Sequence, residues 1–133
     1  MNGLVSRWAL LVLLASMSIV PSCASVSAEE IRSANYGELR PDYQEAIKAL
    51  MSTQLKDPYS AVYSFSVPRK GYCQDGWAVG GQKHFGYIVP TGINAKNSFG
   101  GFVGQKPYYF MIENGVVSDI AAMFLYNMAA YAE

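Results

Sequence analysis

The sequence predicts an α+β domain with an N-terminal amphipathic helix, an antiparallel meander of about four strands and a C-terminal apolar helix. Three observations lead to this prediction. Apolar residues recur at helical spacing after Pro41, polar and apolar residues alternate from Ser60 to Val67, and no charged residue occurs between Asp119 and Glu133 in a mostly apolar segment. The expected strands are joined by segments too short for parallel crossovers, which favours antiparallel pairing.

The first helix is expected to begin at Pro41, because proline suits the first helical position, where its missing N–H has no partner to lose. The helix is expected to end at Lys56-Asp57-Pro58, because proline disfavours helical geometry in the residue before it. Its apolar face is formed by residues spaced i, i+3, i+4 and i+7, namely Tyr43, Ala46, Ile47 and Leu50.

The strands are expected at residues 60–67, 83–89 and 107–112, with a return strand from Val116. Pro90 predicts a bulge after the second strand. Asn114-Gly115 is a strong signal for a tight hairpin turn, because both positions of a type I′ turn need positive φ. The glycine-rich segment 70–81 is expected to be a loop or an irregular hairpin, with Trp77 folded over the domain as a lid.

The last helix is expected to start at Asp119 or Ser118, either of which can cap it. Its apolar residues continue round the helix, so it should be buried on two sides or meet a partner. The residues on its heavier face are Ile120, Met123, Phe124, Met128 and Tyr131.

Residues 1–22 are interpreted as a signal peptide, because the apolar run from Ala9 to Val20 is too short for a membrane span. Two processing sites remain open. Val20-Pro21-Ser22-Cys23 resembles a lipobox except at Pro21, and would make Cys23 the lipidation site of an outer-membrane lipoprotein facing the periplasm. Cleavage after Ala28 would instead release a secreted or periplasmic protein. Residues 23–40 then form a tether, and residues 41–133 form a single domain.

Charge and cysteine content narrow the function classes. Ten basic residues balance ten acidic ones, and the mild basic excess between Arg69 and Lys106 is spread thinly, so no nucleic-acid partner is expected. The chain has two cysteines. Since Cys23 would be acylated or removed, Cys73 has no partner for a disulfide within the mature chain.

Catalytic and metal-binding patterns are weak. Cys73 and His84 are the only residues that could form a nucleophile and base, and each is more often a structural residue. No ligand spacing predicts a metal site, and no motif predicts a cofactor. The chain is therefore expected not to be an enzyme.

The segment from Asn94 to Gly104 is the best candidate for binding. Its polar and aromatic residues would suit a polymeric sugar, a lipid head group or a peptide strand, although the phenylalanines could instead plug the end of the core. The candidate binding residues are Asn94, Lys96, Asn97, Ser98, Phe99 and Phe102.

Two stretches, residues 55–63 (LKDPYSAVY) and residues 94–102 (NAKNSFGGF), resemble small uncharacterised bacterial envelope proteins and lipoproteins. The resemblance covers roughly residues 41–117 and implies no established activity or site residue. The expected function is an exported, lipid-anchored, non-enzymatic envelope protein that binds a protein or cell-wall component. The alternatives are a secreted inhibitor of a cell-wall hydrolase and an enzyme that uses Cys73 with His84.

Overall fold

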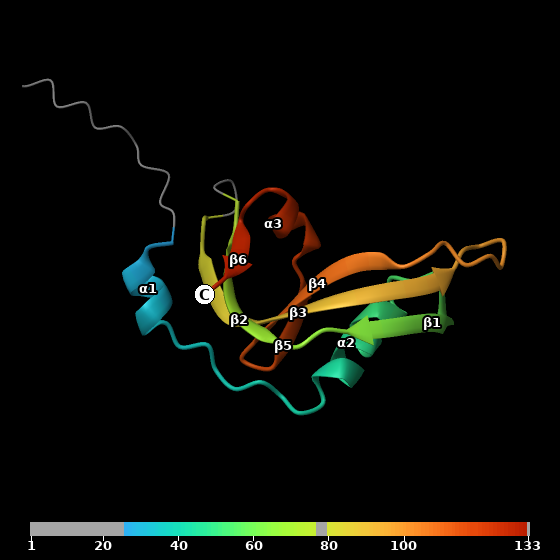
Figure 1. Cartoon of the computed structure of the whole chain (residues 1–133), viewed down its shortest axis with the longest axis horizontal. Helices are drawn as coiled ribbons and strands as arrows, with labels where there is room; N and C mark the ends of the chain where they lie inside the picture. Colours follow the sequence, from blue (N-terminus) through green and yellow to red (C-terminus); the bar gives the residue numbers. More distant parts are fainter. Residues whose placement is uncertain (1–25, 77–79, 133) are drawn as a thin grey trace, which may run out of the picture.

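A single antiparallel sheet of six strands dominates the fold (Figure 1). The structure is a computed structural model and describes residues 26–76 and 80–132. Within these ranges three short helices accompany the sheet, and none of them is a long apolar helix. The predicted fold class is therefore wrong in its strand number and in its C-terminal helix. The expected signal peptide, Cys23 and Trp77 lie outside the described residues.

The longest strand, β3, organises the sheet. Its C-terminal half pairs with β1 and its N-terminal half with β2 along one edge, while β4 pairs along the other edge. The sheet order is β5-β4-β3-β2-β6, with β1 beside β3 and off this path. The strand bounds are β1 Asp57–Phe65, β2 Arg69–Gln74, β3 Lys83–Lys96, β4 Lys106–Glu113, β5 Val116–Asp119 and β6 Ala129–Tyr131.

Pro90 does not interrupt β3, contrary to the expected bulge, and the strand continues to Lys96. The carbonyl of Pro90 accepts a hydrogen bond from the Ser66 amide (2.9 Å), so the nitrogen of Pro90 faces the same edge. That edge is where β1 ends and β2 has not yet begun. The missing N–H therefore costs little in a strand that is otherwise central.

Of the two alternatives for residues 70–81, the hairpin agrees with the structure, because the segment begins as strand β2, which pairs with β3. Gly71 and Gly86 lie opposite each other in the β2–β3 register. A Cβ on Gly86 would lie 2.3 Å from the Ile112 carbonyl oxygen, and one on Gly71 would lie 2.8 Å from the Ala130 oxygen. These glycines allow neighbouring backbones to approach closely as the sheet coils, whereas glycine in a sequence usually indicates a loop.

The predicted C-terminal helix is replaced by a short helix, a turn and a strand. Helix α3 (Ala121–Leu125) has five residues, and Asn127 then adopts a positive φ of 55°. Asparagine tolerates this left-handed conformation, which ends the helix. The chain then forms β6, in which Ala129 lies opposite Cys73. Pairing with the outer edge of β2 satisfies backbone groups that a longer helix would have left unpaired.

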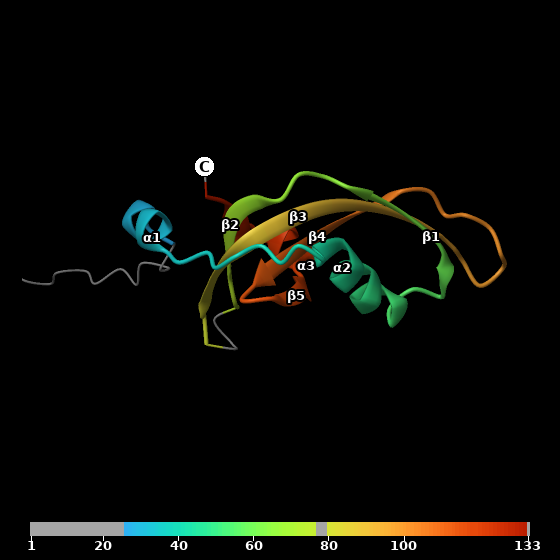
Figure 2. The ribbon, with the colours of Figure 1, turned by 90° about the horizontal axis from the view of Figure 1, so that it is seen from below.

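Two apolar clusters lie on the two faces of the sheet. Helix α2 (Tyr43–Ser52) covers one face and buries Ile47 and Met51, close to where the sequence predicts the amphipathic helix (Figure 2). Each of these side chains contributes about 1.5–3 kcal/mol by burial. The buried sheet residues that pack with them are Val89, Ile93, Phe110 and Ile112. The second cluster lies on the α3 side and comprises Cys73, Ile88, Met111, Ile120 and Ala129.

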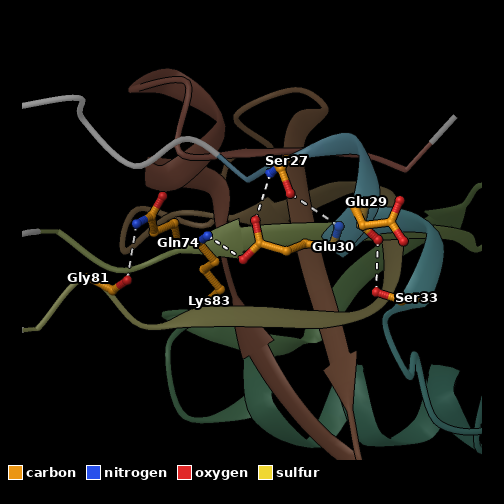
Figure 3. Close-up of polar contacts among 7 residues, drawn as sticks. All are labelled: Ser27, Glu29, Glu30, Ser33, Gln74, Gly81 and Lys83. Carbon is orange, nitrogen blue, oxygen red and sulfur yellow. Dashed lines mark hydrogen bonds and ion pairs between the residues drawn. The ribbon is translucent and has the colours of Figure 1, made fainter.

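Helix α1 (Ala28–Ser33) lies within the segment expected to be a tether, and Figure 3 shows how it is held. Ser27 caps it: its hydroxyl accepts the Glu30 amide (3.2 Å), and the Glu30 carboxylate accepts the Ser27 amide (2.8 Å). The same carboxylate pairs with Lys83 Nζ of β3 at 2.6 Å. The Lys83 hydrogen bond, followed by those from Ser27, lowers the pKa of Glu30 to about 2. Glu30 thus links the cap of α1 to the sheet.

Candidate functional site

The β3–β4 hairpin extends beyond the rest of the sheet and carries most of the predicted binding residues. Its strands are paired as far as Ile93 and Lys106, and its connection lies at one end of the long axis (Figure 1). Helix α1 lies at the opposite end in both views (Figures 1 and 2). We call residues 96–106 the hairpin tip.

Asn97 shapes the hairpin tip through local hydrogen bonds. Its side-chain oxygen accepts the amides of Phe99 (2.9 Å) and Gly101 (3.1 Å). Its backbone carbonyl accepts the amide of Gly100 (3.0 Å), which has a φ of +80° and needs glycine for that reason. The sequence Asn97-Ser98-Phe99-Gly100-Gly101 therefore encodes its own turn without support from the core.

Apolar side chains on this turn face outward. Phe99 is 96% exposed and Phe102 is 54% exposed, and Val103 beside them is also exposed. The alternative in which Phe99 plugs the end of the core is therefore wrong. Lys96 lies opposite Phe102, with its Nζ 5.4 Å from the ring centroid. Exposed apolar side chains grouped at a projecting end are typical of a contact surface.

The predicted binding residues do not all belong to the tip. Lys96, Asn97, Ser98, Phe99 and Phe102 do, whereas Asn94 lies on β3 opposite Val62. The side-chain oxygen of Asn94 is buried and has no hydrogen-bond partner among the described residues. Asn94 is therefore a partly buried strand residue and lies outside the exposed hairpin tip.

The fold adds residues to this end of the molecule that sequence reasoning missed. Strand β1 starts beside the tip, because Asp57 lies opposite Lys96, and this brings the fully exposed Tyr59 to the same end of the sheet. A cavity of about 200 Å³ lies at the foot of the hairpin. It has an apolar floor that includes Ile93 and Ala95, and three lysines contribute to its lining: Lys56, Lys96 and Lys106. In the sequence, Lys96 and Lys106 on either side of Phe99 were the one signal for a basic surface here. Nothing in the sequence indicated that Lys56 lies beside them.

A larger hollow of about 360 Å³ lies nearby, between the end of β1 and the start of β4. No acidic or basic side chain lines it, and Gln105 lies so close over Gly92 that a Cβ there would meet its amide nitrogen at 1.7 Å. This hollow offers less specific chemistry than the lysine-lined cavity.

Cys73 and His84, the possible nucleophile and base, lie opposite each other on β2 and β3. The thiol is buried and contacts the Met111 sulfur at 3.6 Å. Burial, together with the charges of Asp75 and Glu113, raises the pKa of Cys73 to about 11, so the nucleophilic thiolate is scarce at neutral pH.

The His84 ring is occupied by two carboxylates. Its Nδ1 lies 2.9 Å from Glu113 Oε2, and its Nε2 lies 3.3 Å from Asp75 Oδ2. Burial lowers the His84 pKa, but the hydrogen bonds and charges of Glu113 and Asp75 outweigh this effect and raise it above 6.5. When the ring is protonated, both nitrogens donate to these carboxylates, and neither can then accept the thiol proton.

Within residues 26–76 and 80–132, no group of three or more His, Cys, Asp and Glu side chains is arranged to hold a metal ion. None of the helices in these ranges has the length and apolar character of a membrane-crossing segment. Comparison with protein-family models, curated proteins and solved structures finds no match to this chain.

Proposed function

We propose that the protein is a non-enzymatic binding module of the cell envelope, exported and anchored by a lipid on Cys23, which contacts another envelope component through the hairpin tip. The observation that supports this most directly is the outward position of Phe99 at the end of a projecting hairpin. Helix α1 lies at the other end of the molecule, so an anchor that precedes α1 in the chain would leave the tip accessible.

The cap of α1 favours lipid attachment over cleavage after Ala28. Cleavage there would remove Ser27, whose hydroxyl and amide complete the capping box with Glu30. A chain that starts at Cys23 keeps this cap. Loss of a serine N-cap typically costs about 1 kcal/mol, so the lipidated form would hold α1 more firmly.

The surroundings of Cys73 and His84 also favour binding over catalysis by this pair. The thiol has a raised pKa, and both ring nitrogens of the histidine are engaged by carboxylates. A nucleophile and base pair needs a thiol hydrogen-bonded to a free ring nitrogen. We therefore propose that both residues stabilise the sheet.

A pull-down from a detergent-solubilised envelope fraction tests the contact surface. We expect the double variant Phe99→Ser/Phe102→Ser to lose the captured partner while its circular dichroism spectrum stays unchanged. The matched control is Leu125→Ser/Tyr126→Ser, which removes exposed apolar side chains from the end of α3. Equal capture by the wild type and the tip variant would refute the proposed surface.

The intact mass of the membrane-extracted mature protein tests the anchor. We expect a chain that begins with an acylated Cys23, and a mass that corresponds to a start at Glu29 would exclude it.

The variant Cys73→Ser tests whether the thiol has a catalytic role. We expect this variant to keep the phenotype of the wild-type protein.

Inhibition of a cell-wall hydrolase is a second candidate, and the projecting hairpin is the observation that favours it. A convex loop with an exposed aromatic residue can enter the cleft of an enzyme. Titration against lysozyme-type hydrolases should then show inhibition that depends on Phe99, and no effect at micromolar protein would eliminate this candidate.

A further inference from the structure

The hairpin tip combines apolar and basic side chains in a defined order along the long axis. Phe99 lies on the turn at the end of the hairpin, with Phe102 and Val103 also exposed. Lys96 and Lys106 lie behind them, at the ends of the two strands. Lys56, which follows α2, lines the same cavity as these two lysines.

The three lysines have no acidic partner in the part of the chain that the structure describes, since none of its ion pairs includes them. Residues 96–106 contain no Asp or Glu. Asp57 lies opposite Lys96 in the strand register, and its carboxylate oxygen accepts the Ser60 amide at 3.3 Å. This end of the molecule therefore carries a cluster of positive charges next to the exposed apolar side chains of the hairpin tip.

From this arrangement we propose that the hairpin tip binds the surface of an anionic lipid membrane. Phe99, Phe102 and Val103 would enter the boundary between head groups and acyl chains, and Lys56, Lys96 and Lys106 would contact the anionic head groups. Apolar residues that insert about 5–10 Å, with basic residues at the level of the head groups, are the usual chemistry of interfacial binding. The inference rests on the proposed function, because it names the partner of the same surface.

The shape and chemistry of the tip favour lipid over a cell-wall glycan. A sugar is recognised in a concave site by several convergent polar groups. The turn that carries Phe99 projects from the end of the sheet, its phenylalanines offer no hydrogen bond, and the Asn97 side-chain oxygen is already engaged by Phe99 and Gly101. A bilayer interface, in contrast, accepts a projecting apolar turn without specific polar contacts.

The position of the tip is compatible with an N-terminal anchor. Since α1 and the tip lie at opposite ends of the long axis, a molecule lying along a bilayer would contact it at both ends (Figure 1). A single acyl chain holds a protein only weakly, and a second membrane signal stabilises the attachment. The tip would provide that second signal.

Vesicle sedimentation tests the proposal directly. The mature chain, residues 23–133, is expressed with Cys23→Ser in every sample, so that neither an acyl chain nor the apolar segment from Ala9 to Val20 contributes to binding. We expect binding to vesicles of phosphatidylcholine with phosphatidylglycerol, weaker binding to phosphatidylcholine alone, and a decrease as salt is raised. Phe99→Ser/Phe102→Ser should lower the partition coefficient about tenfold or more. Replacement of Lys56, Lys96 or Lys106 by Gln, one at a time, should lower it about fivefold.

Matched variants separate the tip from general surface effects. Leu125→Ser/Tyr126→Ser and Lys48→Gln remove apolar area and one positive charge elsewhere, and neither should change vesicle binding. Phe99→Trp adds a fluorescent probe at an exposed position, and its emission should shift to the blue more strongly with anionic vesicles than with phosphatidylcholine alone.

Three results would overturn the proposal. The first is equal vesicle binding by the wild type and the tip variants. The second is loss of binding to purified peptidoglycan rather than to vesicles in these variants, which would make the cell wall the partner. The third is capture of an envelope protein that depends on Phe99 without any vesicle binding, which would leave the proposed function in place. If neither capture nor vesicle binding depends on the tip, the proposed function falls as well.

Discussion

Two phenylalanines illustrate how differently the fold uses the same side chain. Phe110 on β4 is fully buried between the sheet and α2, whereas Phe99 is 96% exposed at the hairpin tip. The turn around Phe99 is held by the Asn97 side chain and the conformation of Gly100, so its shape does not depend on where the phenylalanine points. The residue is free to serve contact rather than stability.

Substitutions at these positions should have opposite effects on stability. Phe99→Ser/Phe102→Ser should change the free energy of unfolding by no more than about 0.5 kcal/mol, because exposed substitutions rarely do more. Phe110→Ala should lower it by about 3–5 kcal/mol through loss of burial and the cavity it leaves. Urea denaturation monitored by circular dichroism measures both. A large loss for the tip variant would place its phenylalanines in the core.

The charge of His84 should make stability depend on pH. The folded pKa of His84 lies above its unfolded value of 6.5, because Glu113 and Asp75 outweigh the effect of burial. Its stabilising contribution is therefore complete below pH 6.5 and is lost as the pH rises through the folded pKa.

We expect His84→Gln to lower the free energy of unfolding by about 1 kcal/mol at pH 6 and to have a smaller effect at pH 9. Denaturant unfolding of the wild type and the variant at the two pH values checks this. An identical loss at both would show that the imidazolium charge does not contribute.

At the scale of elements, the sheet depends on close contacts between neighbouring backbones. Gly86 lies under the Ile112 carbonyl, and Gly71 lies opposite it on β2. Both belong to the half of the sheet that encloses Cys73, Ile88 and Met111 on the α3 side. Glycine in these strands is a requirement of packing between strands and does not indicate a loop.

Gly86→Ala should therefore be destabilising. The added Cβ would lie 2.3 Å from a backbone oxygen that cannot move without shifting β4, and such overpacking typically costs about 1–3 kcal/mol. Gly76→Ala is the matched control, because its Cβ would meet only the Met128 methyl group at 3.8 Å. Thermal unfolding distinguishes the two, and equal melting temperatures would contradict the proposed strand contact.

At the scale of the whole molecule, the N-terminal segment is fastened to the domain by few contacts. Glu30 joins α1 to β3 through Lys83, and Tyr36 is buried with its ring at a T-shaped angle to Phe85. These contacts fix one end of the long axis, while the hairpin tip extends from the other end (Figure 1).

The attachment of α1 should be sensitive to acid. The folded pKa of Glu30 is about 2, below its ordinary value of 4.5, so the stabilisation it provides is present above pH 4.5 and is lost as the pH falls through about 2. An NMR titration of the Glu30 carboxyl and the Ser27 amide should show a midpoint near pH 2. In Lys83→Gln the midpoint should move toward 4.5, and an unchanged midpoint would show that the ion pair does not cause the shift.

The sequence by itself determined the elements whose signals are local. The spacing around Ile47, the apolar run of β4 and the turn at Asn114-Gly115 each predict their element, because helix period, strand burial and positive φ depend on neighbouring residues. The glycine and aromatic content of residues 94–104 also singled out the hairpin tip as the candidate site. The expectations of export and of a lipid on Cys23 stay predictions.

Only the tertiary structure decided the features that depend on distant partners. The segment after Asn127 forms a strand because β2 offers an unpaired edge, and β2 is a strand because Gly71 allows close packing against residues far along the chain. The grouping of Lys56 with Lys96 and Lys106 follows from β1 pairing with the end of β3, and the exposure of Phe99 shows only in the folded chain. Apolar content and glycine spacing are local properties, whereas burial and strand pairing depend on which surfaces meet in the folded chain.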